Sequence, residues 1–166
     1  MGAIDELLAR HRAGLARRTC CDADPGHAAP RLRVTVLTCM DGRIDPVRVL
    51  GLRLGDVHVL RNGGGLVTDD ALRSLVLSQH ALGTQEVMVI QHTSCGVQGL
   101  RDEQFADRLE SQTGVDLDLD FGGFDDVEAS VRASLAKVRE CAWLVRRDAA
   151  RGFVYDVANG QLREVS

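Results

Sequence analysis

The fold is decided by residues 32–43, LRVTVLTCMDGR, in which a mostly apolar run is closed by Cys39, Asp41 and Arg43. A second stretch with the same organisation spans residues 87–96, VMVIQHTSCG, where a histidine and a cysteine follow the apolar run. Each run has the length and β-branched content of a buried strand. In an open parallel α/β sheet, ligands bind at the carboxyl ends of the strands. The sequence therefore predicts that both polar groups converge at that edge.

Length and composition limit the classes of protein that need to be considered. The chain has 166 residues and a net charge of −4, which fits one domain over residues 1–166 and gives no reason to expect nucleic acid as a partner. No apolar run approaches the roughly 20 residues that span a bilayer, and the charged N-terminus lacks the apolar core of a signal peptide. We therefore expect a cytoplasmic protein that binds a small molecule and no membrane.

The chain contains five cysteines, an odd number. Without an export signal, this count argues against a disulfide framework and favours metal binding, catalysis or burial. The adjacent Cys20 and Cys21 could form a strained redox pair or remain two unpaired thiols, and the sequence does not assign them a role.

Residues 1–31 are expected to form an N-terminal helical arm and a loop. Within them, residues 3–17 place Ile4, Leu7 and Leu8 on one face at helical spacing, which predicts an amphipathic helix. This helix could dock on the core of its own chain or on another subunit. Residues 19–31 are rich in turn formers and read as a loop.

The rest of the chain alternates between strand and helix patterns and ends in a hairpin. Strands that alternate with helices predict a mostly parallel central sheet flanked by helices, in a single α/β domain, because parallel neighbours need crossover connections. The hairpin adds a C-terminal antiparallel strand. The expected strands are residues 33–38, 57–60, 87–91, 153–157 and 162–165, and the expected helices begin at Asp45 and Thr68 or span residues 99–110 and 125–141.

Cys39, His92 and Cys95 form a candidate zinc site. Zinc takes four ligands in tetrahedral geometry, and catalytic sites leave one position for water or substrate. The His-x2-Cys spacing lets two ligands from one turn reach the same ion, and Cys39 would come from a neighbouring strand end. Zinc fingers keep their ligand pairs close in sequence, so this long gap favours a catalytic site. The alternative interpretation is that each residue is buried for packing alone.

Asp41 and Arg43 lie next to this candidate site. They could form only a surface ion pair, which would contribute little. Beside a metal, the Asp41 carboxylate can reach either the ion or Arg43. A bidentate contact with Arg43 would hold the carboxylate away from zinc and leave the fourth position open to water.

Three motifs in order resemble those of the β-class carbonic anhydrases. They are Cys-x-Asp-x-Arg at residues 39–43, Arg-Asn-x-Gly-Gly at residues 61–65 and His-x-x-Cys-Gly at residues 92–96, and the match spans roughly residues 33–100. The resemblance implies one zinc ion per chain, homodimers or dimers of dimers, and an N-terminal helix that lies across a partner subunit. It also implies that the zinc ligands are Cys39, His92 and Cys95, with Asp41 and Arg43 as the catalytic pair.

The resemblance further implies reversible hydration of carbon dioxide to bicarbonate and a proton. In that mechanism a zinc-bound hydroxide attacks carbon dioxide, Asp41 accepts a hydrogen bond from the hydroxide, and Arg43 orients Asp41. In some members the carboxylate closes onto zinc, so Asp41 would be a fourth ligand in such a state. The expected substrate pocket includes Asn62, Gly64, Gly65 and Val67, and glycine permits close backbone approach beside the metal.

The sequence leaves three alternatives to carbon dioxide hydration at a catalytic zinc. Relatives on the same scaffold hydrolyse carbon disulfide or carbonyl sulfide, and a small linear apolar substrate suits either activity. A closed structural zinc site would use Asp41 as its permanent fourth ligand. Finally, Cys95 to Arg101 fits the Cys-x5-Arg pattern of thiolate phosphatases, although Asp102 stands where such enzymes carry a hydroxyl.

Overall fold

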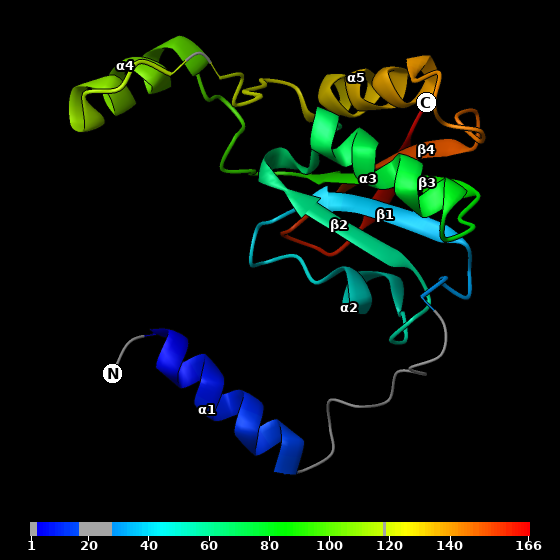
Figure 1. The fold of residues 1–166 in the computed structure, drawn as a ribbon. Coiled ribbons are helices and arrows are strands. Elements are labelled where there is room, and N and C mark those ends of the chain that lie inside the picture. Colours follow the sequence, from blue (N-terminus) through cyan, green and yellow to red (C-terminus); the bar gives the residue numbers. More distant parts are fainter. Residues whose placement is uncertain (1–2, 17–27, 118) are drawn as a thin grey trace.

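A five-stranded sheet forms the centre of the protein in the computed structural model, which describes residues 3–16, 28–117 and 119–166. The strands lie in the order β2-β1-β3-β4-β5. Helices α3 (Asp69–His80) and α5 (Val127–Glu140) cover one face of this sheet, and the short helix α2 (Pro46–Leu50) covers the other (Figure 1). The strands are β1 (Val34–Cys39), β2 (His58–Asn62), β3 (Glu86–His92), β4 (Ala150–Tyr155) and β5 (Leu162–Val165).

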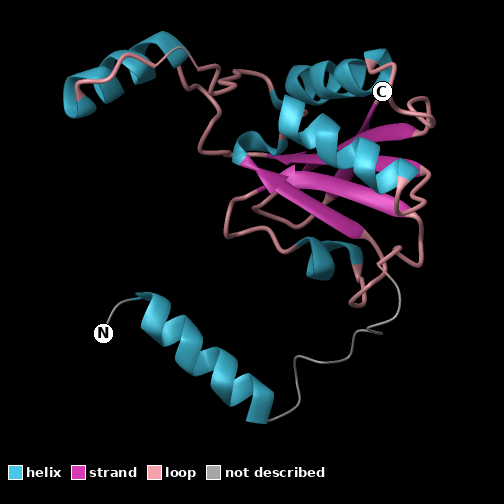
Figure 2. Ribbon diagram, viewed as in Figure 1, coloured by secondary structure: helices cyan, strands magenta, loops and turns pink. Residues whose placement is uncertain are grey.

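Strand pairing confirms the predicted fold class. The β1–β2, β1–β3 and β3–β4 pairs are parallel, and β5 runs antiparallel to β4. Figure 2 shows the strands in magenta between cyan helices. The predicted ends of three strands were too early, because Cys39, Asn62 and His92 are the last residues of their strands. The ladder continues there, and the Met40 N–H still donates to the Asn62 carbonyl at 2.8 Å.

The chain reverses direction across the sheet between β1 and β3. From β1 it passes to β2 on one side, and it then returns to β3 on the other side of β1. Such a reversal opens a crevice at the carboxyl ends of the two central strands. The fold therefore brings Cys39 and His92 to neighbouring positions at the edge where ligands bind.

Helices α3 (Asp69–His80) and α5 (Val127–Glu140) pack on the sheet through a hydrophobic core. Leu75 of α3 and Val131 of α5 are fully buried and belong to one cluster with Leu37 of β1 and Val89 of β3. Thr68 caps α3 as predicted, since its hydroxyl accepts the Ala71 N–H. This packing covers one face of both strands that carry the candidate metal ligands.

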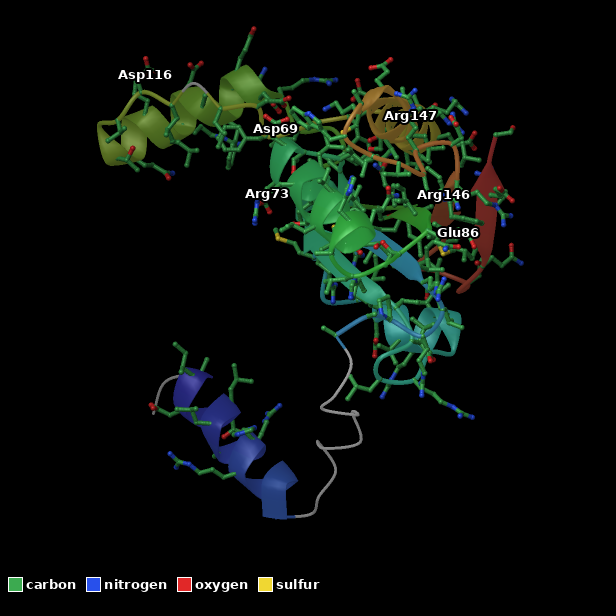
Figure 3. The ribbon with its side chains drawn as sticks, turned by 45° about the vertical axis from the view of Figure 1, so that its right-hand side comes forward. Asp69, Arg73, Glu86, Asp116, Arg146 and Arg147 are labelled. Atoms are coloured by element: carbon green, nitrogen blue, oxygen red, sulfur yellow. The ribbon has the colours of Figure 1, made fainter. Side chains whose placement is uncertain are left out.

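Helix α4 (Asp102–Thr113) begins three residues later than predicted. Gly99 has a φ of +77° and donates its N–H to Phe124, so the backbone there is not helical. The Asp102 carboxylate accepts hydrogen bonds from the backbone N–H groups of residues 121–123. These bonds join the start of α4 to the end of the segment that follows it, so that the two form one excursion from the sheet. No residue of α4 is buried, and Figure 3 shows Asp116 at the outer end of this excursion.

Helix α1 (Ala3–Ala16) lies apart from the sheet in Figure 1. Its Ile4 and Leu7 side chains are 73 % and 60 % exposed, so docking on the core of its own chain, one of the two expected arrangements, is not observed. Cys20 and Cys21 lie outside the described residues. Among the helices that the structure describes, none has the length and apolar character needed to cross a membrane.

Candidate metal centre

Three potential metal ligands meet at the switch point of the sheet. Cys39 ends β1, His92 ends β3, and Cys95 follows in the loop after β3, and all three are buried. Their ligand atoms lie within 4.8 Å of one another, and the two Sγ atoms are 3.9 Å apart. Two thiolates bound at 2.3 Å to one tetrahedral zinc ion would lie about 3.8 Å apart. The spacing of the sulfur atoms therefore fits zinc.

The orientation of His92 also fits a metal. Its Nδ1–H donates to the Thr93 carbonyl at 2.9 Å, which leaves the lone pair on Nε2. Nε2 is buried without a hydrogen-bond partner in the described part of the chain. A buried polar atom without a partner costs free energy, and a metal ion in this group would supply the missing partner. Burial lowers the pKa of His92, which favours the neutral ring that binds metals.

An apolar shell surrounds the two cysteines. Cys39, Cys95 and Ile44 form a buried cluster, and Phe124 and Tyr155 pack against it. Burial raises the pKa of the Cys95 thiol. A bound cation reverses this preference because it stabilises the thiolate directly. A positive ion at this site would therefore favour the thiolate form of Cys95.

Asp41 and Arg43 form the bidentate pair that the sequence suggested. Arg43 donates from Nε to Oδ1 at 3.0 Å and from Nη2 to Oδ2 at 2.6 Å, and its backbone N–H also reaches Oδ1. These hydrogen bonds hold the pKa of the Asp41 carboxyl well below its usual range. Oδ2 lies 3.8 Å from the free Nε2 of His92. The carboxylate therefore stands at the edge of the metal group while both of its oxygens are bound by Arg43.

The segment after β2 lies directly on the ends of β1 and β3. Gly64 and Gly65 belong to the short turn η1 (Gly63–Gly65), and both have positive φ values. A Cβ atom on Gly65 would lie 2.8 Å from the backbone nitrogen of Cys39. The Asn62 side chain closes this turn, because it both donates to and accepts from the backbone of Leu66. The glycines thus allow the backbone to approach the candidate metal ligands.

The expected pocket residues do not all face one cavity. Asn62 and Val67 line a cavity of about 670 Å³ that extends to residues 120–126 and to α5, whereas Gly64 and Gly65 do not line it. The three candidate ligands, Asp41 and Arg43 are also absent from its lining. The lining of this cavity therefore gives no direct outline of a substrate site beside the candidate ligands.

The phosphatase alternative is not supported by the position of Arg101. Both oxygens of Asp125 accept hydrogen bonds from the Arg101 guanidinium at 3.0 Å. A phosphate cradle would need this guanidinium to face the Cys95 thiol. Cys95 instead belongs to the buried metal group.

Two residues beside the centre had no predicted role. Ser94 adopts a φ of +54°, and its carbonyl accepts Arg43 Nη2 at 2.8 Å. Arg61 donates to the backbone carbonyls of Cys39 and Asp41. Arg61 belongs to the Arg-Asn-x-Gly-Gly motif noted in the sequence, whereas no sequence pattern predicts the left-handed backbone of Ser94.

Together, the fold and site define an α/β protein with a mostly parallel sheet and, at its switch point, a Cys2His group that could hold a metal ion. The sequence model of the carbonic anhydrase family matches residues 34–115. Beta-carbonic anhydrase 1 of Mycobacterium tuberculosis is 38 % identical over 137 residues, which cover 82 % of this chain and 84 % of the relative. The chain belongs to the β-carbonic anhydrase family of enzymes.

Two further comparisons refine this placement. A crystal structure of carbonic anhydrase from Streptococcus mutans superposes with a TM-score of 0.91 at 39 % identity, covering 100 % of this chain and 99 % of that one. Carbon disulfide hydrolase of Acidithiobacillus thiooxidans is 33 % identical over 152 residues, which cover 79 % of this chain and 76 % of the relative. The relatives thus include enzymes named for two different substrates.

Proposed function

We propose that this enzyme catalyses the reversible hydration of carbon dioxide to bicarbonate and a proton, with one zinc ion per chain held by Cys39, His92 and Cys95. The observation that carries the proposal is the convergence of these three buried ligand groups beside the Asp41–Arg43 pair. Zinc, when bound, supplies a Lewis acid that makes water nucleophilic near neutral pH. The remaining chemistry comes from the residues of the chain.

Asp41 is the group that orients the attacking water. Its pKa is held low, so the carboxylate stays ionised at neutral pH and accepts a hydrogen bond from a water at the metal group. Arg43 restricts this carboxylate through two parallel hydrogen bonds. A fixed acceptor holds a lone pair of the water toward the substrate, which lowers the entropic cost of attack.

Arg43 also favours a catalytic over a purely structural metal site. In a closed structural site, an Asp41 oxygen would have to turn to the metal and leave the guanidinium. Arg43 is itself anchored by the Ser94 carbonyl, so the pair is held from two directions. The bidentate arrangement therefore supports a fourth metal position that is open to water.

Carbon disulfide is the second candidate substrate, because a carbon disulfide hydrolase is 33 % identical over most of the chain. Carbonyl sulfide belongs with it, since all three molecules are small, linear and apolar. The apolar shell around Cys39 and Cys95 suits any of them. We favour carbon dioxide because the relatives with the higher identities over most of the chain are carbonic anhydrases.

We propose that the active form is a homodimer or a dimer of dimers in which α1 lies across a partner subunit. The support is the exposure of Ile4, Leu7 and Leu8 along one helix within the single chain. An isolated helix of 14 residues is marginal in water, so this apolar face needs a cover. Light scattering on the purified protein and on Leu7→Glu tests this proposal, with a smaller mass expected for the variant.

We also propose that the enzyme acts in the cytoplasm, in keeping with the free thiols at Cys39 and Cys95.

The substrate proposal is tested by assaying one zinc-loaded preparation against carbon dioxide in a stopped-flow instrument and against carbon disulfide by sulfide release. We expect hydration of carbon dioxide and at most slow release of sulfide. Rapid sulfide release without carbon dioxide hydration would move the assignment to the second substrate. Arg101→Gln serves as a matched control, because this arginine lies outside the metal group and should leave the hydration rate unchanged.

A further inference from the structure

Arg61 crosses from β2 to the backbone that follows β1. It is an exposed residue of its strand, yet its Nε donates to the Cys39 carbonyl at 2.9 Å and its Nη2 to the Asp41 carbonyl at 2.8 Å. One guanidinium thus bridges the backbone of a candidate metal ligand and that of the candidate catalytic carboxylate. Its hydrogen bonds thus go to the backbone carbonyls of these two residues.

The sheet register explains why an arginine is needed at this position. Arg61 pairs with Thr38 in the parallel ladder, and β2 ends one residue later at Asn62. Beyond the Met40–Asn62 hydrogen bond, the segment that carries Asp41 has passed the end of the neighbouring strand. Carbonyls two residues apart point to the same side of an extended backbone. The Arg61 side chain therefore donates hydrogen bonds to these carbonyls where the β2 backbone no longer can.

The charge of Arg61 is directed at these two carbonyls. In the part of the chain that the structure describes, no carboxylate forms an ion pair with its guanidinium. Hydrogen bonds from a charged donor are stronger than those between neutral groups. The planar fork of arginine can serve two acceptors at fixed positions, which the single ammonium of lysine cannot reproduce.

We propose that Arg61 is a positioning residue that holds the Cys39–Asp41 segment in place opposite His92 and Cys95. The proposal rests on the metal site proposed above and adds a residue that acts on it through the backbone. Groups that orient metal ligands from outside typically change metal affinity or activity by 10–100-fold when they are replaced. Loss of Arg61 should therefore affect zinc retention and the aim of Asp41 together.

The first test measures the transfer of zinc from the loaded protein to a chromophoric chelator. We expect Arg61→Gln to release zinc about tenfold faster than the parent chain, and Arg61→Lys to fall between them. Arg132→Gln is the matched control, because it removes an exposed arginine of α5 whose hydrogen bond goes to Glu128 rather than to the metal ligands. Unchanged release from Arg61→Gln would overturn the proposal. Since no substrate is added, the result does not depend on which molecule the enzyme hydrates.

The second test separates local positioning from general stability in the zinc-free protein. Cys39 is 3 % exposed, so its alkylation by iodoacetamide reports opening of the segment that Arg61 bridges. We expect both Arg61 variants to raise labelling of Cys39 several-fold relative to labelling of the buried Cys141. Arg61→Lys keeps the positive charge, so a rise in that variant reflects lost bridging. If alkylation became equally faster at Cys39 and Cys141, in line with a lower global stability, Arg61 would only stabilise the fold. That result would contradict the proposal. If the parent chain bound no zinc, the metal site itself would fail, and that result is distinct from either labelling outcome.

Discussion

Gly65→Ala is the substitution whose effect can be worked out most fully from the structure. Gly65 has a φ of +64°, and an added Cβ would lie 2.8 Å from the Cys39 nitrogen and 3.0 Å from the Ile90 oxygen. Both atoms are backbone, so neither can move aside as a flexible side chain would. The left-handed conformation costs alanine about 1–2 kcal/mol, and overpacking adds about 1–3 kcal/mol. We expect the free energy of unfolding to fall by about 2–5 kcal/mol.

Gly51→Ala provides the matched reference. Gly51 has nearly the same φ, +63°, but nothing lies within 4 Å of its added Cβ. It should therefore carry only the conformational cost of about 1–2 kcal/mol. Urea denaturation of both variants without zinc isolates the packing contribution, because bound metal would stabilise the folded state of each to a different degree. Equal destabilisation of the two variants would refute the close contact between η1 and the end of β1.

Three further predictions concern the site and the sheet edge. Arg43→Ala should reduce hydration by at least about tenfold while zinc content stays near one per chain, because the carboxylate loses its orientation; stopped-flow rates and metal analysis check this, and full activity would contradict it. Cys39→Ser should lose most of its zinc on dialysis, since a thiolate ligand is removed; unchanged zinc would take Cys39 out of the site. Hydrogen bonds from Arg151 lower the pKa of Glu164, so their stabilising contribution is present above about pH 4.3 and is lost as the pH falls through the lower folded value. Glu164→Gln should therefore lower the urea midpoint slightly at pH 7, and the difference from the parent chain should shrink as the pH falls below the pKa of a free carboxyl; a difference that does not shrink in acid would contradict this.

The parallel core of this fold was predictable because its signal is local and strong. Strands buried on both faces require continuous apolar runs, and the run ending at Thr38 has that character. The polar residues that close such runs were therefore expected at one edge. Their meeting at the switch point follows from the strand order, which short crossover connections restrict to few alternatives.

The ends of strands and the starts of helices were harder to predict from the sequence, because they depend on contacts with distant residues. The ladder extends to Cys39 because Met40 bonds to Asn62 of another strand. Helix α4 begins at Asp102 rather than near Gly99 because Gly99 has a positive φ and donates its N–H to the carbonyl of Phe124, which lies far along the chain. Contacts of this kind leave no periodic trace in the sequence.

In the candidate site, too, some features could be predicted from the sequence and others depend on the fold. The types and spacing of the potential ligands were visible in the sequence, and the pairing of Asp41 with Arg43 followed from two charged residues at short separation. The bridge from Arg61 to the carbonyl of Cys39 joins residues 22 positions apart and depends on the sheet register. The cavity beside Asn62 is lined in part by residues 120–126, which the sequence did not relate to the site.

The most direct test of zinc-dependent hydration is a stopped-flow assay on one preparation before zinc removal, after chelation and after return of the metal, from about pH 6.5 to 9. We predict activity that rises with pH, disappears with the zinc and returns when about one equivalent per chain is restored. Full zinc occupancy of Cys39, His92 and Cys95 with no hydration of carbon dioxide at any pH would contradict the proposed function, and so would activity that persists after the metal is removed.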